Sequence, residues 1–246
     1  MYIDRRILYI ILGLIILSNV VGLLTNTDAI LNILMTLPAV LIAITFHEFA
    51  HGFAADRLGD DTARRQGRLN LNPFSHLDPI GTIMLVFAGF GWGKPIEINP
   101  RNFNRTVKMS VGEAIVAAAG PIMNLILAIV FAIIYAVVWK FAPDFLGTQI
   151  GGIVILLLRA CITINIGLGI FNLIPLPPLD GSKIIGGFLP YRVKSWFENY
   201  YHIFYIVFVL IWVTGIAGMI ISPLISLTYE GIMSVVSSIF KVYMII

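Results

Sequence analysis

Charged residues are scarce in this sequence. Only 12% of its 246 residues are Asp, Glu, Lys or Arg, about half the fraction of an average soluble domain. Hydrophobic residues make up 59% of the chain, and the mean hydropathy is +0.94. This composition excludes an ordinary soluble globular protein and predicts an integral membrane protein with several spans.

Cysteine is almost absent too. The one cysteine, Cys161, lies within an apolar stretch, so the chain has no disulfide framework. A buried cysteine usually packs as a small hydrophobic residue, and that is our interpretation of Cys161. The net charge of +3 is small and gives no reason to expect nucleic acid as a partner.

Long apolar runs are what the sequence has in abundance. Six segments approach the ~20 residues that a helix needs to cross a bilayer, namely 7–24, 31–55, 113–139, 150–172, 201–221 and 224–246. The first lacks an A-x-A-like cleavage site, which favours a retained helix over a signal peptide. We therefore predict an all-α polytopic membrane protein of about six transmembrane helices, forming a single domain over 1–246.

Basic residues predict the orientation of this bundle. With six spans, every Lys and Arg except Lys140 and Arg159 falls on one side of the membrane. The positive-inside rule makes that side the cytoplasm and places both termini there. Arg159 lies within the fourth segment, where a functional intramembrane charge and a side chain that extends to the outer interface are equally open interpretations.

The interval between the second and third segments has a different pattern. It is rich in Gly and Pro, and its apolar stretch 80–90 is too short to span a bilayer. We predict a short β or re-entrant hairpin there, with a short strand at Ile96–Ile98. Ser110 and Glu113 have the spacing of a capping box at the start of the third helix.

Residues His47-Glu48-Phe49-Ala50-His51 form an HExxH pattern at the end of the second segment. On a helix, positions i and i+4 share one face, so both imidazoles can bind one metal ion. Glu48 lies beside that face, where it can move the proton of a water molecule. The alternative is two core histidines and a glutamate that helix partners satisfy. Within a membrane that alternative is poor, because an unpaired glutamate costs several kcal/mol.

A catalytic zinc site normally has three protein ligands and one open position. The strongest candidate for the third ligand is Asp180, in the segment NLIPLPPLDG at the cytoplasmic end of the fourth helix. Its prolines end the helix, and Gly181 permits a sharp turn after Asp180. By helical rise, His47 lies about 24 Å from the start of the second segment, which places the metal near the cytoplasmic boundary of the bilayer.

Four motifs together carry a family resemblance: HEFAH, NPFSHLDPIG, AAAGPIMN and NLIPLPPLDG. In this order they resemble the site-2 protease family of intramembrane zinc metalloproteases, in its compact branch without PDZ or CBS domains. The resemblance covers residues 31–187, the expected catalytic core, and residues 201–246 would be C-terminal helices. It implies one catalytic Zn²⁺ with His47, His51 and Asp180 as ligands and Glu48 as the catalytic residue.

The resemblance also implies roles for two further polar residues. Asn172, which opens the NLIPLPPLDG motif, would bind the substrate backbone or stabilise the oxyanion. His76 would position the hairpin, contact substrate or occupy the open zinc position in a resting state. The alternative, a structural histidine hydrogen-bonded in a turn, is our preferred interpretation. Asn124 follows the Gly120-Pro121 kink, where packing the third helix against the metal-bearing helix is the favoured role.

The sequence thus predicts an intramembrane zinc-dependent endopeptidase. Its substrates would be transmembrane or membrane-proximal segments of a protein or peptide, cut near the cytoplasmic face of the lipid bilayer, as in regulated intramembrane proteolysis. Two alternatives use the same ligands: a metal or ion transporter, and a catalytically silent membrane-binding factor. The transporter predicts an inverted repeat, and none is visible in the sequence.

Overall fold

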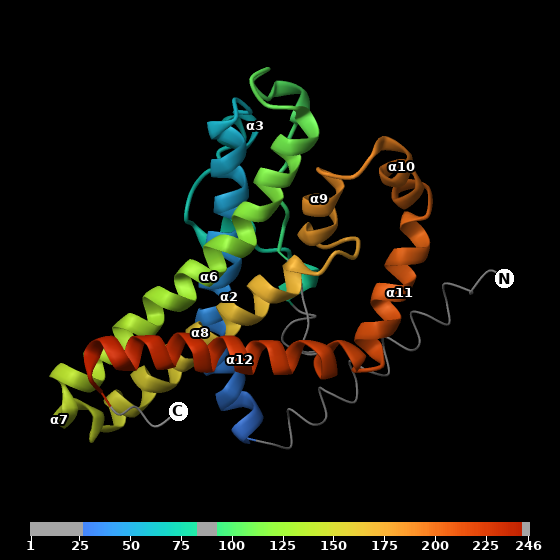
Figure 1. Cartoon of the computed structure of the whole chain (residues 1–246). Coiled ribbons are helices and arrows are strands. Elements are labelled where there is room, and N and C mark those ends of the chain that lie inside the picture. Colours follow the sequence, from blue (N-terminus) through green and yellow to red (C-terminus); the bar gives the residue numbers. More distant parts are fainter. Residues whose placement is uncertain (1–26, 83–92, 243–246) are drawn as a thin grey trace.

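The computed structural model describes residues 27–82 and 93–242 (Figure 1). Within these ranges four helices are long and apolar enough to cross a membrane. They are α2 (Thr27–Arg57), α6 (Met109–Phe141), α8 (Gln149–Leu173) and α12 (Ile216–Phe240). The first three match the predicted second, third and fourth segments closely. The predicted first span, 7–24, lies outside the described residues.

Shorter elements connect these helices. They are α3 (Thr62–Arg65), α4 (Pro73–His76), the 3-10 helix η1 (Pro100–Asn102), α7 (Pro143–Leu146), α9 (Asp180–Gly186), α10 (Tyr191–Asn199) and α11 (Tyr201–Val213). Figure 1 shows α9, α10 and α11 on one side of the crossing between α2 and α6, with α12 running across α8. The described part of the chain is all-helical, as the composition predicted.

The C-terminal helices differ from the predicted segments 201–221 and 224–246. The break lies earlier, at Gly215, which adopts a left-handed conformation with a φ of 76° that favours glycine. Helix α11 therefore has only 13 residues, about 20 Å of helical rise, which is short of a bilayer core. The gap between the predicted segments, residues 222–223, lies within α12, which includes Pro223. The Tyr229-Glu230-Gly231 sequence does not interrupt this helix either.

The predicted hairpin is not a regular β structure in the described residues. Leu77 and Gly93 form one isolated antiparallel bridge, and no strand lies within 27–82 or 93–242. Residues Ile96–Ile98 pair with no strand among the described residues, and the Ile96 main-chain N–H donates to the side chain of Glu48. The interior of the predicted hairpin, 83–92, lies outside the described residues.

The main core lies where α6, α8 and α12 meet. Its fully buried members include Ala128, Ala132 and Ala136 of α6, which face Ile162 of α8 and Met233 of α12. Small residues on one helix let the backbones approach closely, which compensates for the weak hydrophobic driving force between helices in lipid. This packing fixes α6 and α8 relative to each other, and both of them support the candidate site.

The predicted capping box at the start of α6 is wrong. The helix begins one turn earlier than expected, with Lys108 as its N-cap and no side-chain cap. Ser110 is therefore already inside the helix. The Glu113 carboxylate instead accepts a hydrogen bond from Lys194 of α10 at 2.9 Å. This ion pair links the amphipathic helix α10 to the first turn of α6.

Candidate metal centre

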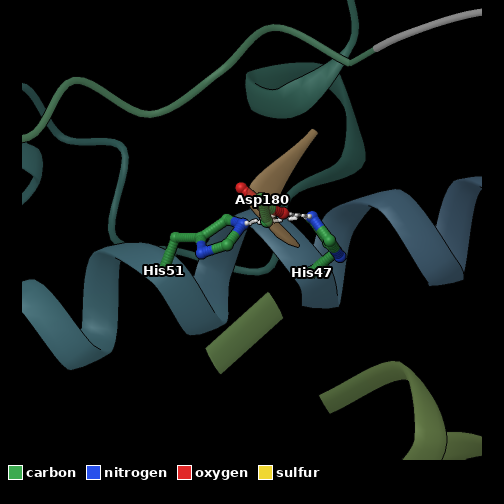
Figure 2. A group of neighbouring side chains, drawn as sticks. All are labelled: His47, His51 and Asp180. Atoms are coloured by element: carbon green, nitrogen blue, oxygen red, sulfur yellow. Dashed lines mark hydrogen bonds and ion pairs between the residues drawn. The ribbon is translucent and has the colours of Figure 1, made fainter. Parts of the chain in front are cut away.

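The two histidines of the HExxH pattern lie one turn apart on α2, and their rings turn toward a common point (Figure 2). The Nε2 atoms of His47 and His51 are 3.0 Å apart. Both side chains are buried, with 6% and 7% of their surface exposed. The i, i+4 spacing therefore places both imidazoles on one face of the helix, as predicted.

Asp180 reaches the same point from a distant part of the chain. Its Oδ2 atom lies 3.2 Å from Nε2 of each histidine, and Figure 2 shows the carboxylate between the two rings. Helix α8 ends at Leu173, just before the proline-rich stretch, and α9 begins at Asp180. As predicted, the prolines end one helix, and the Asp180 carboxylate lies at the start of the next.

The role of Gly181 differs from the sharp turn that we expected. Gly181 lies in the first turn of α9 and is not among the positive-φ glycines of the described residues. A Cβ atom there would lie 2.3 Å from the main-chain oxygen of Ile174 and 2.4 Å from that of Leu173. The absence of a side chain thus lets α9 pack directly against the end of α8, which brings Asp180 to the histidines.

One face of α6 holds both imidazole rings in position. The Val116 carbonyl accepts a hydrogen bond from His51 Nδ1 at 2.7 Å, and Asn124 Oδ1 accepts one from His47 Nδ1 at 2.6 Å. With Nδ1 bound to α6, each ring presents its Nε2 to the shared point. Between these two contacts, Gly120 leaves space for the rings, because a Cβ there would lie 2.5 Å from His51 Nε2.

Asn124 is itself fixed by a buried hydrogen-bond chain. Its Nδ2 donates to the Ala43 carbonyl at 3.0 Å and to Asn165 Oδ1 at 2.9 Å. Asn165 Nδ2 in turn donates to the Cys161 carbonyl within α8. Both asparagines are fully buried. The chain of hydrogen bonds connects α2, α6 and α8 and determines that the amide oxygen of Asn124, and not its nitrogen, faces His47, an arrangement typical of the outer shell of a metal site.

The donor set fits a zinc ion. His47, His51 and Asp180 each offer one ligand atom, and these atoms all lie within 4.8 Å of one another. A tetrahedral site with bonds of 2.0–2.1 Å separates its ligand atoms by about 3.3 Å, close to the 3.0–3.2 Å seen here. Two imidazoles and one carboxylate are common zinc ligands, and three protein ligands leave a fourth position open.

The two imidazoles also keep the third ligand ionised. Burial raises the pKa of Asp180, but hydrogen bonds with His47 and His51 and the charges of these rings more than offset that effect. The pKa of Asp180 therefore lies well below its usual range, and the carboxylate binds as an anion at neutral pH.

Glu48 lies on α2 between the two histidines in sequence but is not one of the three grouped residues. Its Oε2 atom accepts a hydrogen bond from the main-chain N–H of Ile96 at 2.9 Å. A glutamate next to a metal site that does not bind the metal itself has the placement of a general base.

Comparison with known proteins gives a consistent result. Residues 146–214 match the model of peptidase family M50. The chain is 37% identical over 202 residues to a Bacillus subtilis protein named "Putative zinc metalloprotease YwhC", which covers 82% of this chain and 90% of that protein. The chain belongs to peptidase family M50.

More distant relatives have similar names. Proteins named "Putative zinc metalloprotease Rip2" are 31% identical over 145 residues in Mycolicibacterium smegmatis and 29% identical over 151 residues in Mycobacterium tuberculosis. These matches cover 57% and 60% of this chain and 52% and 54% of the relatives. No solved structure matches the chain significantly. The M50 family includes the site-2 proteases, so the resemblance in the four motifs is confirmed.

Like Glu48, the predicted substrate-binding residues of this M50 peptidase, His76 and Asn172, lie outside the metal group. His76 is fully buried, and its Nε2 donates to the Asn70 carbonyl at 2.8 Å, which fits the preferred structural role. Asn172 Nδ2 donates to the Leu168 carbonyl at 3.0 Å within α8. Asp78, from the same motif as His76, accepts a hydrogen bond at Oδ1 from the Gly81 main-chain N–H at the start of the helical residues 79–82.

Arg159, for which the sequence left two interpretations open, lines a cavity away from the metal group. This cavity, of about 360 Å³, lies between α8 and α12 and is lined by Arg159, Thr163, Ile225, Ser226, Tyr229 and Glu230. Arg159 and Glu230 thus line the same cavity. None of its lining residues belongs to the metal group.

The sequence reasoning missed the supporting residues of α6 and α8. Val116, Gly120 and Asn124 are spaced four apart, which puts them on one face of α6. The one available signal was an asparagine within the long apolar part of this helix, four residues after a glycine. We had assigned Asn124 to helix packing, whereas it also holds His47 by a hydrogen bond.

Proposed function

We propose that this protein is an intramembrane zinc-dependent endopeptidase in which His47, His51 and Asp180 bind one Zn²⁺ and Glu48 is the general base. The observation that carries the proposal is the convergence of three ligand atoms beside Glu48, at one end of an apolar helix. Family M50 membership supports a metalloprotease over a binding protein that only uses the same residues.

The chemistry follows from the residues in place. When bound, zinc supplies Lewis acidity for activating water and polarising the scissile carbonyl. Glu48 accepts a proton from the attacking water and returns it to the leaving amine. Its carboxylate has one oxygen held by the Ile96 amide, so the other oxygen, Oε1, is the one assigned to this transfer. Asn172 and His76 stay predicted contributors to substrate binding or oxyanion stabilisation.

The expected substrate is a membrane-spanning or membrane-proximal peptide segment. His51 lies six residues before the end of α2 at Arg57, about 9 Å of helical rise, so the site lies near one boundary of the bilayer. The basic residues around α3 indicate that this boundary is cytoplasmic. Peptide bonds within a helix are shielded, so the substrate must be extended where it is cut, and pairing with the segment near Ile96 would hold it extended.

Comparison of the wild-type protein with the Glu48→Gln variant tests the proposal. Both are reconstituted in liposomes with a single-span substrate, chosen from membrane peptides that accumulate in cells carrying Glu48→Gln. We expect equal zinc content and a loss of cleavage of at least about 100-fold in Glu48→Gln. Glu113→Gln, which removes a partly exposed ion pair on α6, is the matched control and should cleave normally.

The same experiment separates the alternatives. A catalytically silent membrane-binding factor would show no zinc-dependent cleavage in either protein. A metal transporter would move zinc across the liposome membrane, with or without Glu48. Equal cleavage by wild type and Glu48→Gln would refute the assignment of the base, and unchanged zinc content in Asp180→Ala would refute the assignment of the third ligand.

A further inference from the structure

The extended segment Gly93–Ile98 lies along the face of α2 that carries Glu48. A Cβ atom on Gly93 would lie 2.7 Å from the Ile44 side chain and 3.8 Å from Glu48 Oε1. Two turns further along α2, Ile96 Cδ1 lies 3.0 Å from the position of a Cβ atom on Gly52. Ile44, Glu48 and Gly52 are spaced four apart, so the segment follows one helix face past the general base.

Ile96 is the point where this segment is anchored. Its side chain is buried, with 7% of its surface exposed, and it packs toward Gly52 near Ala63 and Leu69. Its main-chain N–H donates to Glu48 Oε2 at 2.9 Å. A carboxylate with one oxygen held in this way has a defined orientation, because rotation of its side chain would break the hydrogen bond.

Arg68 holds the other end of the same peptide unit. Its Nη1 donates to the Pro95 carbonyl at 2.6 Å, and its Nη2 donates to the carbonyls of Lys94 and Ser75 at 2.7 and 2.9 Å. The Pro95 carbonyl and the Ile96 N–H belong to one planar peptide group. A guanidinium that fixes this carbonyl therefore also fixes the direction of the N–H that points to Glu48.

We propose that Arg68 is a positioning residue for proton transfer by Glu48, acting through the Pro95–Ile96 peptide group. The hydrogen bond to the carbonyl polarises the peptide and strengthens the N–H donor, since hydrogen bonds in a chain reinforce one another. The result is a general base whose Oε1 faces the reaction while Oε2 stays bound. This inference rests on the proposed role of Glu48 and adds the group that orients it.

Arg68 is suited to this task by its geometry. A planar guanidinium offers several N–H donors in a fixed fork and can bind three carbonyls at once, which a lysine ammonium on a flexible stem cannot do in the same arrangement. The nearby Arg65 differs, because it forms an exposed i, i+4 ion pair with Asp61 at 2.8 Å. Such a pair contributes little, so Arg65→Gln is the matched control for Arg68→Gln.

The test measures kcat and KM of the full-length protein in liposomes, with the substrate that the Glu48→Gln comparison identifies. For Arg68→Gln we expect kcat to fall about tenfold to hundredfold, as displaced catalytic groups do, while KM stays within about twofold and zinc content is unchanged. Arg68→Lys should recover part of the loss, and Arg65→Gln should match wild type. A rise in KM with normal kcat would assign Arg68 to substrate docking and overturn the proposal.

A second change tests the peptide group directly and leaves Arg68 in place. Replacing Ile96 by its α-hydroxy acid converts the N–H to an ester oxygen and keeps the side chain. We expect the same fall in kcat. An ester at Glu97, whose main-chain N–H has no hydrogen-bond partner among the described residues, is the control. If Arg68→Gln fails to fold, the Ile96 ester and its Glu97 control test the proposal without it. Normal kcat in the Ile96 ester overturns the proposal.

The failure of this inference is distinguishable from failure of the proposed function. If Glu48→Gln cleaves like wild type, the general base itself is wrongly assigned. If Glu48→Gln is inactive but the Ile96 ester keeps normal kcat, only the positioning role of Arg68 is refuted.

Discussion

Gly120 should be the least replaceable residue of α6. A methyl group at this position would lie 2.5 and 2.6 Å from Nε2 and Cε1 of His51, and 2.7 Å from Cε1 of His47. Normal contacts between such atoms are about 3.5 Å or longer. The Gly120→Ala variant must therefore displace the imidazoles, or α6 as a whole, by about 1 Å.

This displacement exceeds what a zinc site tolerates. Metal–ligand distances hold to about ±0.2 Å, and loss of groups that merely orient a ligand already lowers affinity about 10- to 100-fold. We expect Gly120→Ala to weaken zinc binding by at least about 100-fold, or about 2.7 kcal/mol. Overpacking should also lower stability by about 1–3 kcal/mol.

Competition with a chelator of known affinity measures the zinc dissociation constant of the purified protein in detergent, and thermal unfolding is followed in parallel. Gly152→Ala is the control, because a Cβ atom on this residue of α8 meets nothing within 4 Å. A zinc dissociation constant of Gly120→Ala within threefold of the wild-type value would refute this prediction. The imidazole rings would then have room for a methyl group that the structure does not show.

Three other changes have definite expected outcomes. Asn124→Ala should lower zinc affinity about 10- to 100-fold through loss of the His47 hydrogen bond, measured by the same competition. Gly181→Ala should be strongly destabilising in thermal unfolding, because its Cβ atom would meet the rigid main chain at Ile174. Burial raises the pKa of Asp60, but hydrogen bonds from Thr62, Asn102 and Asn99 lower it by more. The net shift of the Asp60 pKa is therefore downward. Its carboxylate therefore stabilises the fold above about pH 4 and loses that effect as pH falls through the folded pKa. Asp60→Asn should be less stable by about 1–3 kcal/mol at neutral pH, and a difference that persists undiminished toward pH 3 would contradict this.

The helices of the core and the three candidate ligands were predictable because they depend on local features of the chain. Apolar runs of sufficient length gave α2, α6 and α8 within a few residues, and prolines after Leu173 marked the end of α8. The HExxH pattern determines which face of one helix carries two imidazoles, whatever the rest of the chain does.

The C-terminal helices show where local reasoning was insufficient. The predicted segments left a gap at residues 222–223, yet α12 continues through Pro223, since a helix tolerates a proline when its neighbours satisfy the freed backbone groups. The break lies instead at Gly215, which is free to adopt a positive φ. Glu113 likewise had the spacing of a cap, but Lys194, 81 residues away in sequence, binds it.

The sequence by itself determined the membrane class of this protein, its family and the chemistry of its candidate metal ligands, because composition, spacing and residue type suffice for each. Only the tertiary structure decided how those ligands are held. The crossing of α6 over α2 brings Val116, Gly120 and Asn124 to the two rings, and the extended segment at Ile96 reaches Glu48. These contacts join residues that lie 48 to 77 positions apart, and no local periodicity specifies which distant backbone will approach a given helix face.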